Sequence, residues 1–325
     1  MQGKIALEEH FAIPATLADS QVFGAHVWDE LRDRLTDFQD KRLRLMDASG
    51  VEIMIASLNA PAVQAIFDVK RAIEVAREAN DVLAAEIAKR PDRFAGFAAL
   101  PMQDPEEAAR ELIRCVKELG FVGALVNGFS QAGSANSARY YDLPQYRPFW
   151  RTVAALDVPF YLHPRNPLSG AIPGYEGHPW LMGPNWAFHA ETAVHALRLI
   201  GCGLFDEYPT LQIILGHLGE GIPAYLWRID HRNDWMKARH KYAAKKWVAD
   251  YVRDNIVLTT SGNFSTSALN QAIAEIGTNR VLWSADYPFE TISDAAEWID
   301  AAPISEQDRL KIARTNALTL FKLKI

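Results

Sequence analysis

The chain has 325 residues and a formal net charge of -6, with 49% hydrophobic and 23% charged residues. This composition is typical of a globular protein with a sizeable core, and it excludes a chain that is largely disordered. Because the net charge is negative, the protein has no overall positive potential to attract phosphate groups. Neither nucleic acid nor an acidic lipid surface is therefore expected as a partner. The apolar run before Glu8, Glu9 and His10 is too short for a signal peptide, and no apolar stretch is long enough to span a membrane. We therefore expect a cytoplasmic protein.

Short β-rich runs recur along the whole chain. Several are nearly continuous apolar segments without alternation, which is typical of parallel strands covered by helices on one side. The eight runs are residues 4–7, 52–57, 94–99, 123–126, 159–162, 212–215, 256–259 and 281–284.

Segments with helical periodicity lie between these runs. In residues 68–90 the charges fall mainly on one side, and the apolar residues form a broad stripe on the other. The stripe consists of Ile73, Val75, Ala76, Ala79, Val82, Leu83 and Ile87. Three further segments carry capping or stop signals at their ends. They are residues 105–119, between Asp104 and Gly120; residues 266–276, before Gly277; and residues 306–320, after Ser305.

The alternation of strand and helix predicts a parallel sheet, and eight strand-helix units are the number that closes a (β/α)8 TIM barrel. The alternative is an open doubly wound sheet, but the chain lacks both glycine-rich nucleotide-binding motifs that usually accompany one. Without internal repeats or a flexible linker, residues 1–325 are expected to form one domain. Two long connections, 129–148 and 165–186, follow the fourth and fifth strands as insertions. We expect them to form the walls and lid of a pocket.

Side chains that can bind a metal stand at four of the predicted strand ends. Glu8 and His10 end the first strand, His163 the fifth and His217 the sixth, and Asp286 follows the eighth. The carboxyl ends of barrel strands meet at one mouth, so these side chains are expected to converge there. Each residue alone could be a hydrogen-bonded structural group. Burying so many unpaired polar groups is costly, however, and a cation removes that cost, so we predict a metal site.

Several motifs stand at or beside these strand ends. They are ALEEH at 6–10, LNAPAVQ at 58–64, ALVNGF at 124–129, LHPRNP at 162–167, GHLGE at 216–220 and SADYPFE at 284–290. With these motifs the chain resembles the decarboxylase branch of the amidohydrolase superfamily over essentially its whole length. Within that branch it is most similar to the γ-resorcylate (2,6-dihydroxybenzoate) decarboxylase family. The 2,3-dihydroxybenzoate and salicylate decarboxylases are relatives.

The resemblance implies a reversible, non-oxidative decarboxylation of a hydroxybenzoate. It also implies one divalent ion, held by Glu8, His10, His163 and Asp286. Hydrolases of the superfamily usually open with His-x-His and often carry a bridging lysine on strand four, whereas this chain has Glu8-x-His10 and Asn127. One ion is therefore the simpler expectation. A mixed set of imidazoles and carboxylates accepts either Zn2+ or Mn2+, and no organic cofactor is expected.

The resemblance also suggests catalytic roles. Asp286 is expected to protonate the ring carbon that carries the carboxyl group. This role requires a raised pKa despite the nearby cation, which only a pocket of low polarity and the negative charge of the substrate could produce. His217 is expected to bind a substrate hydroxyl or relay protons, with Glu220 orienting it. The alternative for this pair is a structural histidine with a capping glutamate.

The substrate implied by the resemblance is a small, flat aromatic acid, which requires apolar walls. Phe23, Phe188 and Phe289 lie near strand ends or on the predicted pocket loops, and are the candidates for these walls. Asn127 could form a hydrogen bond with a phenol group.

Two other functions use the same scaffold. One is a metal-dependent hydrolase of a lactone or cyclic amide. The other is a barrel without catalytic activity that only binds metal or small molecules. The resemblance favours decarboxylation and points to a homotetramer. Arg228 is expected either to reach the pocket of a neighbouring subunit, as the resemblance suggests, or to form a surface ion pair with Asp230 or Asp234.

Overall fold

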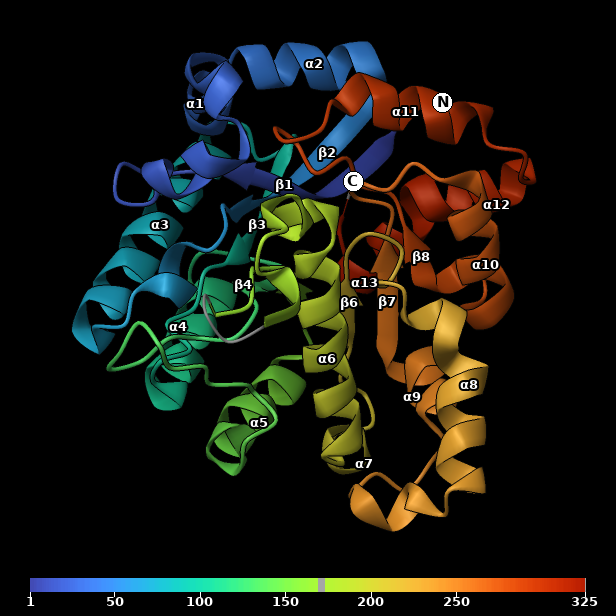
Figure 1. Cartoon of the computed structure of the whole chain (residues 1–325). Helices are drawn as coiled ribbons and strands as arrows, with labels where there is room; N and C mark the ends of the chain where they lie inside the picture. The colour runs from blue at the N-terminus through green and yellow to red at the C-terminus, as the bar shows by residue number, and fades with distance from the viewer. Residues whose placement is uncertain (169–172, 325) are drawn as a thin grey trace.

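Eight parallel strands, paired in chain order from β1 to β8, form the centre of the molecule (Figure 1). The structure, a computed structural model, describes residues 1–168 and 173–324. The strands of these residues are β1 (Lys4–Phe11), β2 (Val51–Leu58), β3 (Phe94–Ala98), β4 (Gly123–Asn127), β5 (Phe160–His163), β6 (Ile213–Leu215), β7 (Ile256–Thr259) and β8 (Val281–Leu282). The predicted (β/α)8 barrel is confirmed.

Helices surround this sheet and cover its outer face (Figure 1). They are α1 (Trp28–Thr36), α2 (Lys41–Ser49), α3 (Val69–Lys89), α4 (Pro105–Lys117), α5 (Arg147–Leu156), α6 (Ala187–Gly201), α7 (Leu204–Glu207), α8 (Ile222–Trp235), α9 (Val248–Asn255), α10 (Thr266–Ile276), α11 (Ile292–Ala301), α12 (Glu306–Leu310) and α13 (Asn316–Phe321). The predicted caps are present, since the side chains of Asp104 and Ser305 accept hydrogen bonds from the first turns of α4 and α12.

Alternate residues of each strand point into the barrel, because side chains alternate between the two faces of a strand. Ile5 and Leu7 of β1, Phe97 of β3 and Tyr161 of β5 belong to the buried cluster that fills the interior. The other face of the sheet packs on the helices in a second, larger cluster. Side chains therefore fill the interior of the barrel, and the mouth formed by the carboxyl ends of the strands is where an active site is expected.

Three details differ from the sequence prediction. Val82 was placed on the buried stripe of α3 but is 37% exposed. Strand β8 ends at Leu282, two residues before the predicted end. The last predicted helix, 306–320, is interrupted by a π-helical turn, Lys311–Thr315. Within this π-helical segment, the carbonyl of Ile312 faces the end of β8. This carbonyl accepts a hydrogen bond from the backbone N–H of Trp283 at 2.9 Å.

The two long connections after β4 and β5 contain short 3-10 helices and lie at the mouth of the barrel. The second connection includes Pro173–Tyr175, Pro179–Leu181 and Gly183–Asn185 in this form. Residues 169–172 of this connection lie outside the described residues. The role of the two connections as insertions that act as a lid stays a prediction.

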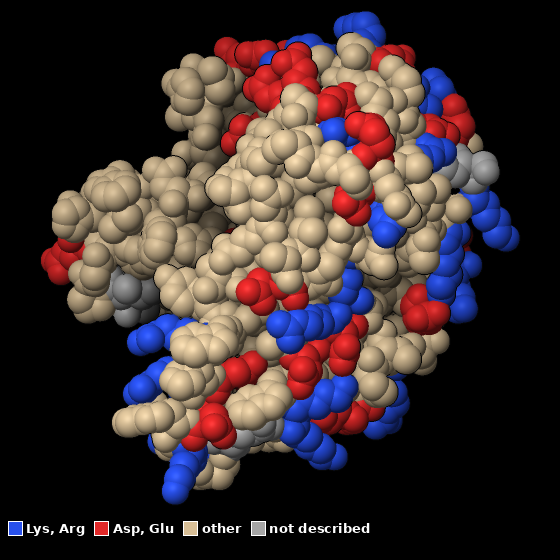
Figure 2. All heavy atoms as spheres, turned by 90° about the vertical axis from the view of Figure 1, so that its right-hand side faces the viewer, with Lys and Arg blue, Asp and Glu red and all other residues tan. Residues whose placement is uncertain are grey.

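Acidic and basic side chains lie next to one another on the surface that Figure 2 shows, which is the side of α8, α10 and α12. Ion pairs such as Arg253 with Glu275, at 3.5 Å, are typical of such a mixed surface. In the described ranges, no helix has both the length and the apolar character required for a membrane span.

Candidate metal centre and active site

Four predicted ligands from three strand ends come together at the mouth of the barrel. Glu8 and His10 belong to β1, His163 is the last residue of β5, and Asp286 lies just after β8. Each offers one ligand atom, and these atoms all lie within 4.8 Å of one another. His10 Nε2 is 3.2 Å from Asp286 Oδ1, and His163 Nε2 is 3.3 Å from Glu8 Oε1. The convergence predicted from strand ends is present, while the role of each residue as a ligand stays a prediction.

The backbone at two of these residues has an unusual conformation. Glu8 has φ 80° and Asp286 has φ 75°, which is the left-handed region that side chains other than glycine rarely adopt. The register between β1 and β2 shifts between Leu7 and Glu9, so the irregularity of β1 falls on Glu8, a candidate ligand. Each such residue costs about 1–3 kcal/mol and persists only where its surroundings hold it. The strain is located where the two carboxylates must face each other.

Three hydroxyl groups hold one oxygen of the Glu8 carboxylate. Tyr161, Thr259 and Ser261 all donate hydrogen bonds to Glu8 Oε2, the one from Thr259 at 3.2 Å. The other oxygen, Oε1, is buried and has no hydrogen-bond partner among the described residues. The carboxylate is thus fixed by one oxygen, and the second is directed toward the other ligand atoms.

The unpaired atoms fit a divalent cation. His10 donates or accepts at Nδ1 with Ser57 Oγ, at 3.2 Å, while its Nε2 is buried without a hydrogen-bond partner in the described part of the chain. Glu8 Oε1 is unpaired in the same way. Each of the two atoms instead lies close to another member of the cluster, His10 Nε2 to Asp286 Oδ1 and Glu8 Oε1 to His163 Nε2, without making a hydrogen bond to it. Buried polar atoms are normally hydrogen-bonded, so this arrangement fits a bound ion. Imidazole nitrogens and carboxylate oxygens are the ligands that Mn2+ and Zn2+ accept.

Two glycines leave the space that this cluster needs. A Cβ atom at Gly216 would lie 3.0 Å from Glu8 Oε2, and one at Gly262 would lie 3.1 Å from Asp286 Oδ2. Both distances are tighter than ordinary van der Waals contact, so a larger residue at either position would push a carboxylate out of place.

His217 and Glu220 form a hydrogen-bonded pair beside the cluster. His217 Nδ1 lies 2.7 Å from Glu220 Oε1. The turn between them is left-handed, with φ 52° at His217 and 55° at Glu220, and Gly219 supplies φ 88° within it. His217 Nε2 points the other way and lies 3.7 Å from Asp286 Oδ2. The imidazole is therefore held between an orienting carboxylate and a carboxylate of the ligand cluster.

The charges of this group favour a proton on His217 and an ionised Asp286. Burial lowers the pKa of His217, but the carboxylates of Glu220 and Glu8 outweigh burial and raise this pKa well above its ordinary value. Burial raises the pKa of Asp286, but the imidazoles of His10 and His217 outweigh it and leave the pKa below its ordinary value. Without substrate, these charges favour a proton on His217 over one on Asp286, and the raised pKa expected of Asp286 with substrate bound stays a prediction.

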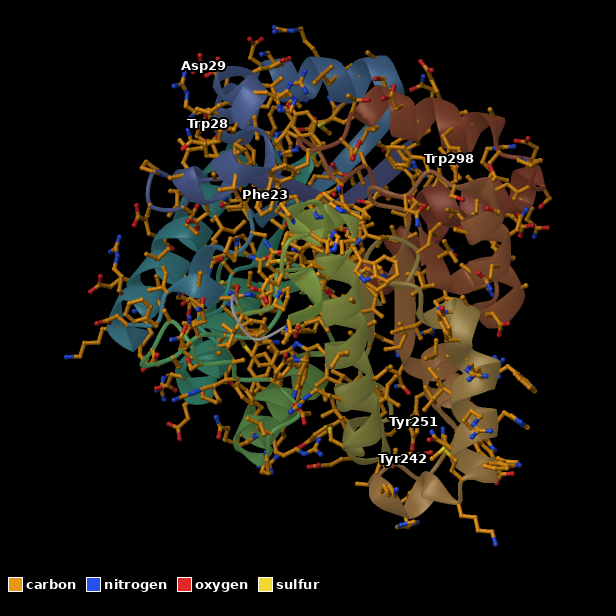
Figure 3. The ribbon with its side chains drawn as sticks, in the orientation of Figure 1. Phe23, Trp28, Asp29, Tyr242, Tyr251 and Trp298 are labelled. Carbon is orange, nitrogen blue, oxygen red and sulfur yellow. The ribbon has the colours of Figure 1, made fainter. Side chains whose placement is uncertain are left out.

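A cavity of about 170 Å3 adjoins the cluster and has aromatic walls. Phe23, Phe188 and Phe289 line it together with His163 and Asp286. The ring of Phe23 lies 5.5 Å from that of Phe188 and 6.3 Å from that of Phe289, in edge-on arrangements. In Figure 3 the label of Phe23 lies near the start of α6, whose first turn contains Phe188. The three predicted aromatic residues thus enclose a space next to the candidate ligands.

Comparison with known proteins identifies the family. The family model described as amidohydrolase matches residues 23–323. The chain belongs to the amidohydrolase family. It is 66% identical over 328 residues to the γ-resorcylate decarboxylase of Rhodococcus jostii, covering 99% of each chain. A crystal structure of 2,6-dihydroxybenzoate decarboxylase complexed with 2,6-dihydroxybenzoate has a TM-score of 0.98 at 64% identity and covers 99% of this chain and 100% of that chain. A third similar structure is a dihydroxybenzoic acid decarboxylase from Polaromonas sp., with bound manganese and the inhibitor 2-nitroresorcinol. It has a TM-score of 0.97 at 64% identity, and the match covers 99% of this chain and 97% of that chain.

Two predicted site residues of this amidohydrolase lie outside the aromatic cavity. The side-chain amide of Asn127 donates to the carbonyl of Asn59 at 3.0 Å and so holds the loop after β2. Its Oδ1 is buried without a partner in the described residues, so a bond to a phenol stays a prediction. Arg228 lies on α8 and lines a separate cavity of about 550 Å3 between α6 and α8, which Glu220 also lines.

The surface ion pair weighed for Arg228 is not found in the described residues. The carboxylate of Asp230 instead accepts hydrogen bonds from the backbone N–H groups of Val248 and Ala249, at 2.8 and 3.0 Å. A role of Arg228 toward a neighbouring subunit is untested and stays a prediction.

The sequence analysis missed the residues that hold the ligands in place. Tyr161, Thr259 and Ser261 around Glu8 were not singled out, and neither was Ser57 beside His10. The sequence feature that could have indicated them is a hydroxyl side chain near the end of a strand, on the face that points into the barrel. That signal is weak, because Tyr and Thr are also ordinary strand residues.

Proposed function

We propose that this amidohydrolase reversibly removes carbon dioxide from 2,6-dihydroxybenzoate to give resorcinol. The observation that carries the proposal is the meeting of Glu8, His10, His163 and Asp286 beside a cavity walled by aromatic rings. Identity of 64–66% over nearly the whole length with γ-resorcylate decarboxylases supports it. We further propose that residues 1–325 act as one domain, since one continuous sheet runs from β1 to β8.

The proposal includes one divalent ion, Mn2+ or Zn2+, held by the four ligands. A divalent ion at this position supplies charge that polarises an ortho-hydroxybenzoate and fixes the orientation of its ring. The manganese in the Polaromonas relative supports this assignment. We expect no organic cofactor.

The chain's own residues are proposed to manage the proton. The carboxylates of Glu220 and Glu8 raise the pKa of His217, and its Nε2 lies 3.7 Å from Asp286 Oδ2, so a proton can pass between them once the anionic substrate is present. Asp286 then delivers this proton to the ring carbon that carries the carboxyl group. The bond between the ring and the carboxylate breaks, carbon dioxide leaves, and the electron pair returns to the ring. Glu220 keeps the imidazole of His217 oriented through its 2.7 Å contact with Nδ1.

The aromatic walls are proposed to hold the ring of the substrate. Replacing Phe23 by alanine is expected to raise KM for 2,6-dihydroxybenzoate about 10-fold with little change in kcat, because it removes an aromatic contact made in both the ground state and the transition state. Steady-state kinetics check this result. Phe67→Ala is the matched control, since Phe67 is 49% exposed and does not line the cavity. An unchanged KM in the Phe23 variant would remove this residue from the binding site.

A panel of hydroxybenzoates tests the function. With Mn2+ or Zn2+ present, 2,6-dihydroxybenzoate is expected to release carbon dioxide and resorcinol in equal amounts, faster than salicylate or 2,3-dihydroxybenzoate. Removing the metal with a chelator is expected to lower this rate about 100-fold or more, and adding it back restores the rate. Both products are measured, by gas analysis and by chromatography. Water-dependent opening of a lactone with no carbon dioxide release would instead establish the hydrolase alternative.

We also propose a homotetramer located in the cytoplasm. Exposed apolar side chains border the cavity between α6 and α8, among them Trp186 at 50% and Tyr225 at 59% exposure. Such side chains are typical of a surface that a second protein molecule covers. Within this proposal Arg228, which lines the same cavity, reaches toward the neighbouring subunit.

A further inference from the structure

Glu9 is a completely buried carboxylate that the proposed mechanism does not use. It lies on β1 directly between two candidate ligands, Glu8 and His10. Its side chain is 0% exposed, so a charged group at this position has lost its contact with water. A carboxylate kept at such a position needs partners that compensate for the lost water.

The partners of Glu9 lie on both sides of Asp286. Glu9 Oε1 accepts hydrogen bonds from the backbone N–H of Ala285 at 2.8 Å and from the hydroxyl of Ser284 at 3.1 Å. Glu9 Oε2 accepts one from the backbone N–H of Tyr287 at 3.0 Å. The two amide groups that flank Asp286 are therefore both bound to one side chain. Asp286 has φ 75°, and a residue in this conformation persists only where its neighbours fix it.

These bonds also cross the place where the two edges of the sheet meet, which we call the β1–β8 junction. In the described residues the backbone ladders join each strand to the next from β1 to β8, but none joins β8 to β1. At the mouth of the barrel the junction is crossed by one backbone bond, from the N–H of His10 to the carbonyl of Tyr287 at 2.6 Å, and by the three bonds to Glu9. Glu8 and His10 stand on one side of this junction, and Asp286 stands on the other.

A buried arginine supports the same junction. Arg42 is fully buried, and its guanidinium group donates to the carbonyl of His10 at 2.6 Å. The same group lies over the ring of Tyr287, with its central carbon 4.9 Å from the ring centre. Its positive charge partly balances the carboxylate of Glu9. The two residues that bind each other across the junction, His10 and Tyr287, are thus both in contact with one cation.

We propose that Glu9 is a positioning residue that sets the separation of the metal ligands across the β1–β8 junction. By binding the amides of Ala285 and Tyr287, it holds the backbone of Asp286 in its left-handed conformation and at a fixed distance from Glu8 and His10. Glu9 touches neither the metal nor the substrate and acts only through Asp286. This inference rests on the metal site of the proposed function.

Glu9→Gln tests the inference, because it keeps the size of the side chain and replaces one accepting oxygen by an NH2 group that faces a donor. We expect its dissociation constant for Mn2+ to rise about 10- to 100-fold, the usual effect of losing a residue that orients a ligand. Titration of the metal-free protein, with free Mn2+ followed by electron paramagnetic resonance, measures this constant without substrate. At saturating Mn2+ we expect kcat to stay about 10-fold or more below that of the unmodified protein, with KM changed less than about 3-fold.

Glu111→Gln is the matched control. Glu111 is also a buried carboxylate, 5% exposed, and it accepts hydrogen bonds from Asn80 and Arg114 on the outside of the barrel. This variant is expected to lower the thermal unfolding midpoint while the Mn2+ dissociation constant stays unchanged. If Glu9→Gln behaves in the same way, with lower stability but unchanged Mn2+ binding, Glu9 is merely structural and the inference is wrong.

Ser284→Ala decides the matter if Glu9→Gln does not fold. It removes one of the three bonds to Glu9, so we expect the Mn2+ dissociation constant to rise about 3-fold, and an unchanged constant overturns the inference. Because Mn2+ binding is measured without substrate, the two proposals fail separately. Weakened binding in a protein that decarboxylates no hydroxybenzoate would refute the proposed function and still support the role of Glu9.

Discussion

Replacing Asp286 by asparagine is expected to lower kcat on 2,6-dihydroxybenzoate by about 10³- to 10⁴-fold. Asparagine has nearly the same shape but cannot carry the proton that the ring carbon must receive. It also removes the negative charge that lies 3.2 Å from His10 Nε2 within the ligand cluster, so the metal is expected to bind more weakly. The measurement is kcat at saturating Mn2+, with the metal content of each sample determined in parallel so that lost metal and lost proton transfer are separated.

Asp254→Asn is the control for this variant. Asp254 is an exposed residue that pairs with Lys246 at 3.0 Å, and its replacement is expected to leave kcat unchanged. If Asp286→Asn retained its full metal content and a kcat within about 10-fold of the unmodified protein, the proton would have to come from another group.

Replacing His217 by asparagine is expected to lower kcat about 10²- to 10³-fold, because it removes the group proposed to supply the proton to Asp286. His231→Asn is a suitable control, since His231 is exposed on α8 and stacks on Trp227 at 4.6 Å. Comparison of the two variants separates loss of the imidazole at the site from a general effect of replacing histidine. Retention of most of the activity in the His217 variant would assign the proton to a different donor.

Glu220→Gln is expected to change the pH profile of the same step. The carboxylate of Glu220 is a main cause of the raised pKa of His217, so its loss lowers that pKa toward the ordinary value. His217 must be protonated to supply the proton, which holds only below its pKa. The alkaline limb of the kcat profile is therefore expected to move to lower pH by about one unit, so that kcat falls about 10-fold at a pH on that limb above both pKa values. If the alkaline limb did not shift in this variant, Glu220 would not be a cause of the raised pKa of His217.

The strands and the convergence of the ligands could be predicted from the sequence. The strands are continuous apolar runs, and helix ends such as Asp104 and Ser305 use local hydrogen bonds that depend only on neighbouring residues. In a parallel barrel the carboxyl end of every strand meets the same mouth, so Glu8, His163 and Asp286 were expected to approach one another although they are far apart in the chain.

The arrangement around the ligands could not be predicted, because it depends on contacts between distant strands. Glu8 and Glu9 are consecutive glutamates, and nothing in their sequence indicates that one faces the cluster and the other crosses to β8. The hydroxyl groups around Glu8 belong to β5 and the end of β7, which are more than 150 residues away from it. The lowered pKa of Asp286 in the absence of substrate also could not be predicted, because the effect of His10 and His217 depends on their distances to it.

Arg165 joins the two long connections at the mouth of the barrel. It begins the second connection, and its guanidinium group donates to the carbonyl of Phe129, at 2.7 Å, and to Gln131 Oε1, at 3.0 Å, both in the first. The group also lies 4.0 Å from the centre of the Phe129 ring. The two connections are therefore mechanically linked through one buried side chain. Exchanging one of them alone for the corresponding loop of a relative, in order to alter which acids are accepted, would break this link, so a successful graft must transfer both loops together with the arginine.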